Sequence, residues 1–199
     1  EAAGVEMFAD RGEVVGPNSV RLKYRGETVS AERILVATGG RVFRPRELKG
    51  QDLAITSNEA FLLQGLPTRV LIAGGGYIAV EFATIFSGLG VETILVYRGD
   101  KILRGFDDDI RAHVQAELER SGVKVVCGTV LKEISELPDG RRLASLTNKV
   151  HFEVDQVMFA IGREPHTQGL GLEAAGVRLT ERGAVAVDMH SRSSVPAIF

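Results

Sequence analysis

The stretch that decides the fold runs from Arg69 to Tyr97 and reads RVLIAGGGYIAVEFATIFSGLGVETILVY. Its apolar start, residues 70–73, is typical of a strand that is covered on both faces. The next segment, residues 77–89, repeats apolar side chains at helical spacing on one stripe. Residues 91–97 then form a second apolar run, so the pattern predicts a strand, a helix and a parallel strand joined by a right-handed crossover.

The turn between the first strand and the helix, Gly74-Gly75-Gly76-Tyr77-Ile78-Ala79, fits the pattern G-x-G-x-x-A. In such a turn Gly74 allows the tight bend, Gly76 lets a pyrophosphate approach the backbone, and Ala79 lets the helix pack closely on the strand. The free N–H groups at the helix N-terminus, which begins with Tyr77 and Ile78, would hold the anion. A plain strand-to-helix turn is the alternative, but the flanking strand and helix favour a dinucleotide site.

The end of the second strand indicates which dinucleotide is bound. An NAD site carries an acidic residue here for the ribose hydroxyls, whereas this chain has Arg98 after Tyr97, and Arg104 six residues later. Two guanidinium groups fit a ribose 2′-phosphate, which NADPH carries and NADH lacks. The alternative is two solvated arginines on a loop. The pair is the most specific functional signal in the chain.

The remaining segments predict an α/β fold with further strands on both sides of this unit. We expect a β-meander in the first 40 residues, with strands at 5–9, 19–24 and 33–37, and a short helix capped by Ser57. A second amphipathic helix is expected at 107–121, a third parallel strand at 123–127 and an antiparallel hairpin around residues 138–140. A buried strand at 156–161 ends at Gly162.

Composition excludes several classes of protein. The 199 residues include 24 basic and 26 acidic side chains in interspersed positions, which gives a net charge of −2 and disfavours a nucleic-acid partner. The longest apolar run, residues 70–80, is too short to span a bilayer. The only cysteine, Cys127, cannot form a dithiol within the chain, and the four histidines show no metal-ligand spacing. We therefore expect no catalytic residue and no metal site in this chain.

These motifs together resemble the glutathione reductase family of flavoprotein disulfide reductases (class I pyridine nucleotide-disulfide oxidoreductases). The resemblance rests on residues 74–83 and on Tyr97-Arg98 through Leu103-Arg104-Gly105-Phe106-Asp107. Residues 34–40 are similar to the family's Ala-Thr-Gly strand, 159–167 to its second such strand, and 191–199 to the approach to its flavin-binding Gly-Asp. The whole chain is covered.

The resemblance implies an enzyme in which NADPH passes a hydride to FAD and the reduced flavin opens a disulfide that reduces the substrate, glutathione disulfide being the first candidate. Tyr77 is similar to the aromatic gate over the flavin ring, and Glu81 to the acid that pairs with a flavin-side lysine. Gly162 resembles a close-approach glycine beside the cofactor, and Thr38 and Gly39 resemble flavin-domain contacts. Ordinary packing, solvation and turn roles are the alternatives for these residues.

On this basis we expect a Rossmann-like NADPH-binding domain at residues 43–163, flanked by partial FAD-binding domain segments at 1–42 and 164–199. The sequence begins at Glu1 without a leader, so we expect a piece of a longer cytoplasmic protein, with a homodimer formed through a domain outside this chain. This piece would bind NADPH without reducing a disulfide. Two alternatives stay open: an NAD(P)H-dependent ferredoxin or nitrite reductase, and a non-catalytic NADPH-binding module.

Overall fold

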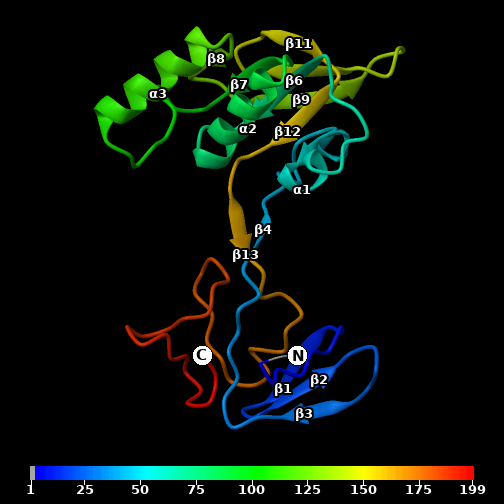
Figure 1. The fold of residues 1–199 in the computed structure, drawn as a ribbon, viewed down its shortest axis with the longest axis vertical. Coiled ribbons are helices and arrows are strands. Elements are labelled where there is room, and N and C mark those ends of the chain that lie inside the picture. Colours follow the sequence, from blue (N-terminus) through cyan, green and yellow to red (C-terminus); the bar gives the residue numbers. More distant parts are fainter. Residues whose placement is uncertain (1–2) are drawn as a thin grey trace. The chain divides into compact units, whose positions relative to one another are not determined.

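The chain forms two compact units in a computed structural model that describes residues 3–199 (Figure 1). Unit 1 comprises Glu1–Arg41 and Glu164–Phe199, and unit 2 comprises Val42–Arg163. The chain therefore changes unit at 41/42 and 163/164, whereas the boundaries expected from the sequence are 42/43 and 163/164. A two-stranded sheet of β4 (Gly40–Val42) and β13 (Arg163–Pro165), which the sequence did not predict, lies at these changeovers.

Unit 2 is built on a parallel sheet of five strands in the order β5-β12-β6-β7-β8. The chain order reverses beside β6, because β7 and β8 follow on one side while β12 and β5 lie on the other. A second, antiparallel sheet has the order β11-β10-β9. The strands are β5 (Ile55–Thr56), β6 (Arg69–Ala73), β7 (Glu92–Val96), β8 (Lys124–Val126), β9 (Leu131–Glu136), β10 (Arg142–Leu146), β11 (His151–Val154) and β12 (Gln156–Phe159).

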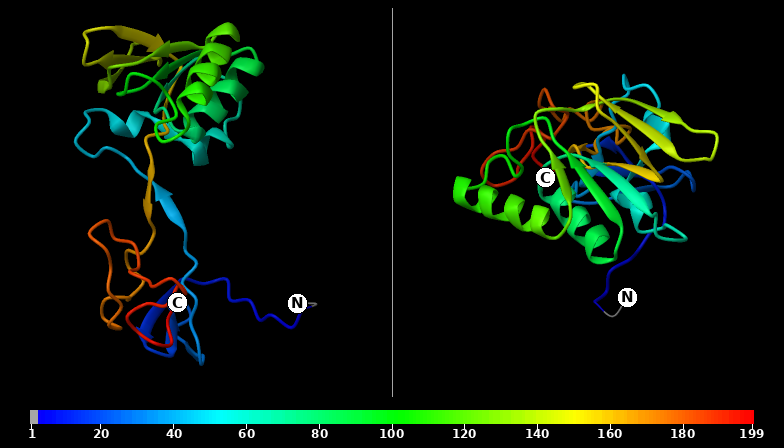
Figure 2. Two further views of the ribbon diagram at one scale, coloured as in Figure 1. Left: turned by 90° about the vertical axis from the view of Figure 1, so that its left-hand side faces the viewer. Right: turned by 90° about the horizontal axis from the view of Figure 1, so that it is seen from above.

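Three layers make up unit 2, because both faces of the parallel sheet are covered. Helices α2 (Tyr77–Gly88) and α3 (Asp108–Arg120) lie on one face, and the antiparallel sheet lies on the other (Figure 2). Successive residues of β6 alternate between these layers: Val70 and Ile72 pack with the helices, and Leu71 and Ala73 pack with the antiparallel sheet. This explains the unbroken apolar run at 70–73, since every side chain is buried.

The segment before β6 contains the 3₁₀ helix η1 (Gln51–Leu53) and the short helix α1 (Ser57–Ala60). The predicted cap at Ser57 is wrong, because Thr56 is the N-cap and Ser57 is the first helical residue. Thr56 accepts a hydrogen bond from Asn58 N, and the Glu59 carboxylate accepts bonds from Thr56 N and Oγ1 at 2.7 and 2.6 Å. The bond from the Thr56 hydroxyl is the main cause that lowers the pKa of Glu59.

Unit 1 contains a three-stranded antiparallel sheet, β1 (Gly12–Gly16), β2 (Ser19–Leu22) and β3 (Thr28–Ser30), and an apolar core of its own. The predicted strand at residues 5–9 is not formed, and the meander begins at Gly12 instead. The predicted strand at 33–37 is reduced to a single parallel bridge between Ile34 and Ile198, with only three backbone hydrogen bonds to residues 197–199.

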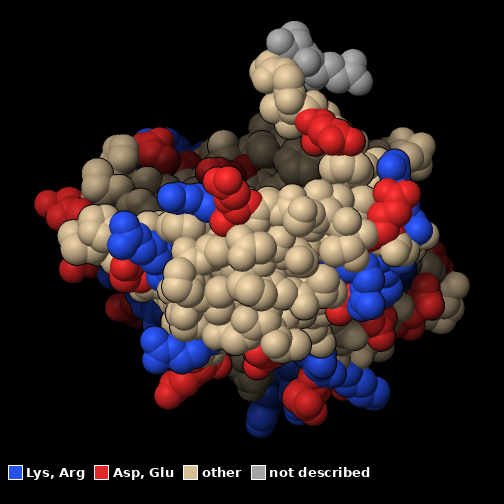
Figure 3. Space-filling view, turned by 90° about the horizontal axis from the view of Figure 1, so that it is seen from below, with Lys and Arg blue, Asp and Glu red and all other residues tan. Residues whose placement is uncertain are grey.

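The surface of unit 1 exposes several large apolar side chains, among them Met7, Leu35 and Met189 at 80%, 74% and 91%. Figure 3 shows one broad face that carries no charged side chain at its centre and is ringed by basic and acidic ones. Within residues 3–199 no helix combines the length and apolar character needed to cross a bilayer.

Candidate nucleotide-binding site

The glycine turn connects β6 to α2 at the carboxyl end of the parallel sheet. Gly74 has a φ of 144° and donates a hydrogen bond to Val96 O at 2.9 Å, so the turn is tied to the end of β7. A Cβ on Gly74 would overlap the carbonyl oxygen of Ala160 and lie 2.7 Å from its carbon. Only glycine fits here, which agrees with the tight-turn role expected from the sequence.

Gly76, unlike Gly74, has open space beside its Cα. It is the N-cap of α2, with a φ of −87° and no side-chain cap, and a Cβ at this position would meet no atom within 4 Å. The helix therefore begins with unoccupied N–H groups at an open Cα, which is the arrangement that an anion needs. Ala79, one turn later, is fully buried against the sheet, and Ile78 packs partly buried beside the same core.

A cavity of about 520 Å³ opens above this turn, within unit 2. Its floor is the glycine turn with the ends of β6, β7 and β12, and its walls come from the segment before α1 and from the start of β9. The volume is in the range of small-molecule and cofactor sites, and the position beside the reversal of strand order is where α/β sheets bind nucleotides. The lining residues include Phe43, Gly76, Tyr97, Arg98, Arg104 and Gly162.

Arg98 and Arg104 both line this cavity, Arg98 two residues after the end of β7 and Arg104 further along the same loop. Both are exposed, and within residues 3–199 neither guanidinium has an ion pair or hydrogen bond to another residue. Most other arginines of unit 2 differ: Arg69 pairs with Glu92, for example, and Arg44 with Glu59. Both cations thus line the same cavity without a protein partner within residues 3–199.

Tyr97 lies between the glycine turn and the arginine loop. Its ring stands so close to two glycines that a Cβ on Gly75 would be 2.9 Å from Cδ1 and one on Gly99 would be 2.6 Å from Cε1. Its backbone is also fixed, because Tyr97 N donates to Val126 O at 2.9 Å. This role of Tyr97 does not follow from the sequence, where the signal is limited to an aromatic residue two positions before Gly99.

The structure does not bring every expected site residue into the cavity. Tyr77 and Glu81 lie one turn apart on exposed positions of α2, with Tyr77 58% exposed, and neither lines the cavity. Thr38 and Gly39 belong to unit 1, where Thr38 donates to His166 O at 2.9 Å and Gly39 adopts a φ of 65°. The roles given to these four residues by resemblance stay predictions.

The single cysteine lies outside the cavity. Cys127 is partly buried against the core between the sheet and the helices. Burial, followed by the carboxylates of Asp100 and Glu119, raises the pKa of its thiol, so it stays protonated at neutral pH. No group of acidic, histidine or cysteine side chains within residues 3–199 could hold a metal ion.

The layered sheet and the glycine turn define a Rossmann-like α/β protein. Comparison with known proteins gives the family: residues 1–199 match the pyridine nucleotide-disulphide oxidoreductases, and the chain belongs to this family.

Similar proteins agree with this assignment. A glutathione reductase from Burkholderia cepacia is 45% identical over 199 residues, which are 100% of this chain and 43% of that protein. A trypanothione reductase from Leishmania donovani is 44% identical over 176 residues, covering 87% of this chain and 35% of its own length. A solved structure, a HOCl-induced flavoprotein disulfide reductase from Escherichia coli, superposes with a TM-score of 0.90 at 26% identity over 98% of this chain and 44% of its own. The chain thus spans less than half the length of these relatives.

Proposed function

We propose that unit 2 is the NADPH-binding domain of a flavoprotein disulfide reductase, and that its parent uses NADPH and FAD to reduce a small disulfide. Glutathione disulfide is the first candidate substrate, which is supported by the glutathione reductases among the relatives. The observation that carries the proposal is that the guanidinium groups of Arg98 and Arg104 line one cavity and have no ion pair or hydrogen bond to another of residues 3–199.

The residues of the cavity fit the nucleotide part by part. The open Cα of Gly76 and the uncapped start of α2 suit a pyrophosphate, because the phosphates can approach the backbone N–H groups there without a side chain between them. Arg98 and Arg104 suit the ribose 2′-phosphate, which forked guanidinium groups recognise well. When bound, NADPH would supply a hydride, and the chain's own residues would bind and orient it.

Unit 1 is proposed to be part of the FAD-binding domain, with Thr38 and Gly39 as flavin-domain contacts. Its exposed apolar side chains support a domain that is completed by further protein. Tyr77 and Glu81 are proposed to face the flavin side of the nicotinamide, and Gly162 the cofactor itself. We further propose a cytoplasmic parent that forms homodimers through a domain outside residues 1–199.

Calorimetric titration of the chain with NADPH and with NADH tests the proposal. NADPH is expected to bind more tightly, and replacing one of the two arginines by alanine should weaken NADPH binding by about 10- to 150-fold, the value of one charge-assisted hydrogen bond. The double variant Arg98→Ala with Arg104→Ala should bring NADPH close to the affinity of NADH, which should itself change little.

The matched control is Arg178→Ala with Arg182→Ala, which removes the same charge from two exposed positions of unit 1. This control should keep the preference for NADPH. Equal binding of the two nucleotides by the unmodified chain, or equal losses for both nucleotides in the cavity variant, would remove the NADPH assignment. Failure of the Gly76→Val variant to weaken either nucleotide would remove the pyrophosphate position.

A further inference from the structure

The loop that carries the two arginines has no regular structure of its own and is held by other elements. It leaves β7 at Tyr97 and reaches α3 at the N-cap Asp107. Arg104, which is exposed, directly follows Ile102 and Leu103, which are almost completely buried. The position of Arg104 in the cavity wall therefore depends on how these two residues are fixed.

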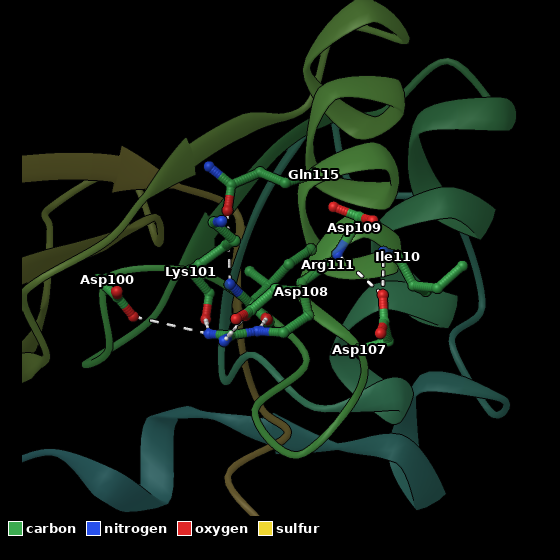
Figure 4. Close-up of polar contacts among 9 residues, drawn as sticks. Asp100, Lys101, Asp107, Asp108, Asp109, Ile110, Arg111 and Gln115 are labelled. Atoms are coloured by element: carbon green, nitrogen blue, oxygen red, sulfur yellow. Dashed lines mark hydrogen bonds and ion pairs between the residues drawn. The ribbon is translucent and has the colours of Figure 1, made fainter.

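Helix α3 fixes the loop mainly through one side chain, Arg111 (Figure 4). Its Nε donates to Ile102 O and its Nη2 to Lys101 O, both at 2.8 Å. Nη1 bonds Asp108 at 2.7 Å, and Nη2 lies 3.6 Å from the Asp100 carboxylate. Only 15% of this side chain is exposed. A guanidinium directed at two consecutive backbone carbonyls of a loop acts on the path of that loop more than on the helix it comes from.

Two further contacts hold the same residues from other sides. The side-chain oxygen of Gln115, one turn after Arg111 on α3, accepts a hydrogen bond from Ile102 N at 3.4 Å. Leu103 N donates to Gly75 O at 2.6 Å, which ties the loop to the glycine turn. Leu103 adopts a φ of 54°, a left-handed conformation that a leucine keeps only when its surroundings impose it.

We infer that Arg111 is a positioning residue for nucleotide selectivity: by binding the carbonyls of Lys101 and Ile102, it holds Leu103 in its left-handed conformation and so presents Arg104 to the 2′-phosphate. Lysine cannot replace it, because an ammonium lacks the planar set of donors that reaches two carbonyls and a carboxylate at once. The inference rests on the proposed function, since it assigns the residue that makes the arginine pair effective.

The test compares NADPH and NADH affinities of Arg111→Lys by calorimetry, beside the unmodified chain. Releasing the loop obliges two arginine side chains and their backbone to be ordered on binding, so NADPH affinity is expected to fall about 5- to 150-fold. NADH affinity should stay within about twofold, because NADH lacks the 2′-phosphate that Arg98 and Arg104 are proposed to bind. A residue that only stabilises the fold would lower both affinities together or neither, and such a result would overturn the inference.

Two controls lie on the same helix. Arg120→Ala removes an arginine that pairs with Glu117 and does not contact the loop, and it should leave the ratio of affinities unchanged. Asp108→Asn removes the closer of the two acidic partners of Arg111 and leaves the two carbonyl bonds in place, so selectivity should be kept. Loss of selectivity in either control equal to that of Arg111→Lys would contradict the carbonyl-binding role.

If Arg111→Lys does not fold, Gln115→Ala tests the anchoring of the loop instead. It removes the acceptor of Ile102 N and should lower the ratio of NADPH to NADH affinity in the same direction. No change in its ratio would then overturn the inference. The Arg98→Ala with Arg104→Ala variant separates the two proposals. If it abolishes the NADPH preference while Arg111→Lys keeps it, only the positioning role fails, whereas an unmodified chain with no preference removes the proposed function itself.

Discussion

Gly74 and Gly76 belong to one motif but have different roles, the tight turn for Gly74 and an open approach to the backbone for Gly76. Substituting each by alanine separates the two roles. At Gly74 a methyl group would overlap the Ala160 carbonyl, on a residue whose own N–H bonds Ala73 O at 2.8 Å. The φ of 144° adds backbone strain. Strain of about 1–3 kcal/mol and overpacking of about 1–3 kcal/mol together predict a loss of about 2–6 kcal/mol in the free energy of unfolding.

Such a loss is large beside the total stability of about 5–15 kcal/mol that a folded protein has. Urea denaturation followed by circular dichroism measures it as a shift in the midpoint. Gly76→Ala is the matched control, because its φ of −87° suits alanine and its Cβ meets no atom within 4 Å. Its free energy of unfolding should change by no more than about 1 kcal/mol.

The two glycine variants should rank in the reverse order when nucleotide affinity is compared. Gly76→Ala keeps the fold but places a methyl group where the pyrophosphate would approach, so both NADPH and NADH should bind more weakly. Equal unfolding midpoints for the two variants would refute the close approach of the Gly74 turn to β12. Normal nucleotide affinity in a well-folded Gly76→Ala variant would refute the use of its open Cα.

Two further predictions concern titratable groups. Hydrogen bonds lower the pKa of Glu59. Its carboxylate therefore stabilises the start of α1 fully at pH values above the pKa of an ordinary glutamate, and this contribution is lost as the pH falls through the lowered pKa. Glu59→Gln should therefore lower the thermal midpoint at neutral pH and match the unmodified chain in acid, and a difference that persists unchanged in acid would contradict the capping box. Because the pKa of its thiol is raised, Cys127 should react with iodoacetamide more slowly than a free cysteine peptide at neutral pH. Mass spectrometry measures the rate of adduct formation, and a rate equal to or above that of the peptide would contradict the raised pKa.

The parts of the fold that the sequence predicts well are those governed by local periodicity. Residues 70–73 are apolar at every position, and 77–89 are apolar at helical spacing, so β6 and α2 follow from the pattern alone. Strand β11, which is short and has no turn glycine before it, was not predicted. The strand expected at 33–37 has the same apolar character as β6, but its pairing is limited to residues 197–199, and sequence pattern does not report how many partners a strand finds.

For the candidate site, the pattern identifies Gly74, Gly76, Arg98 and Arg104, and the structure places all four around one cavity. The missed residues act across the chain. Tyr97 restricts Gly75 from the next strand, and Arg111 reaches carbonyls about ten positions earlier. Such contacts depend on the path of a loop without periodicity, and a lone arginine on a helix has the same appearance in sequence whether it is solvated or buried.

An exposed arginine is a poor recognition element by itself, because ordering its long side chain on binding costs conformational entropy and water screens its charge. Arg98 and Arg104 escape part of this cost only if their backbone is already fixed before a ligand arrives. The loop meets this condition, since Tyr97 is bonded to β8, Leu103 to the glycine turn and Ile102 to α3. Selectivity for a phosphorylated ribose therefore depends on the anchoring of the loop as much as on the two cations, and a homologous site that keeps both arginines but lacks the anchors should discriminate less.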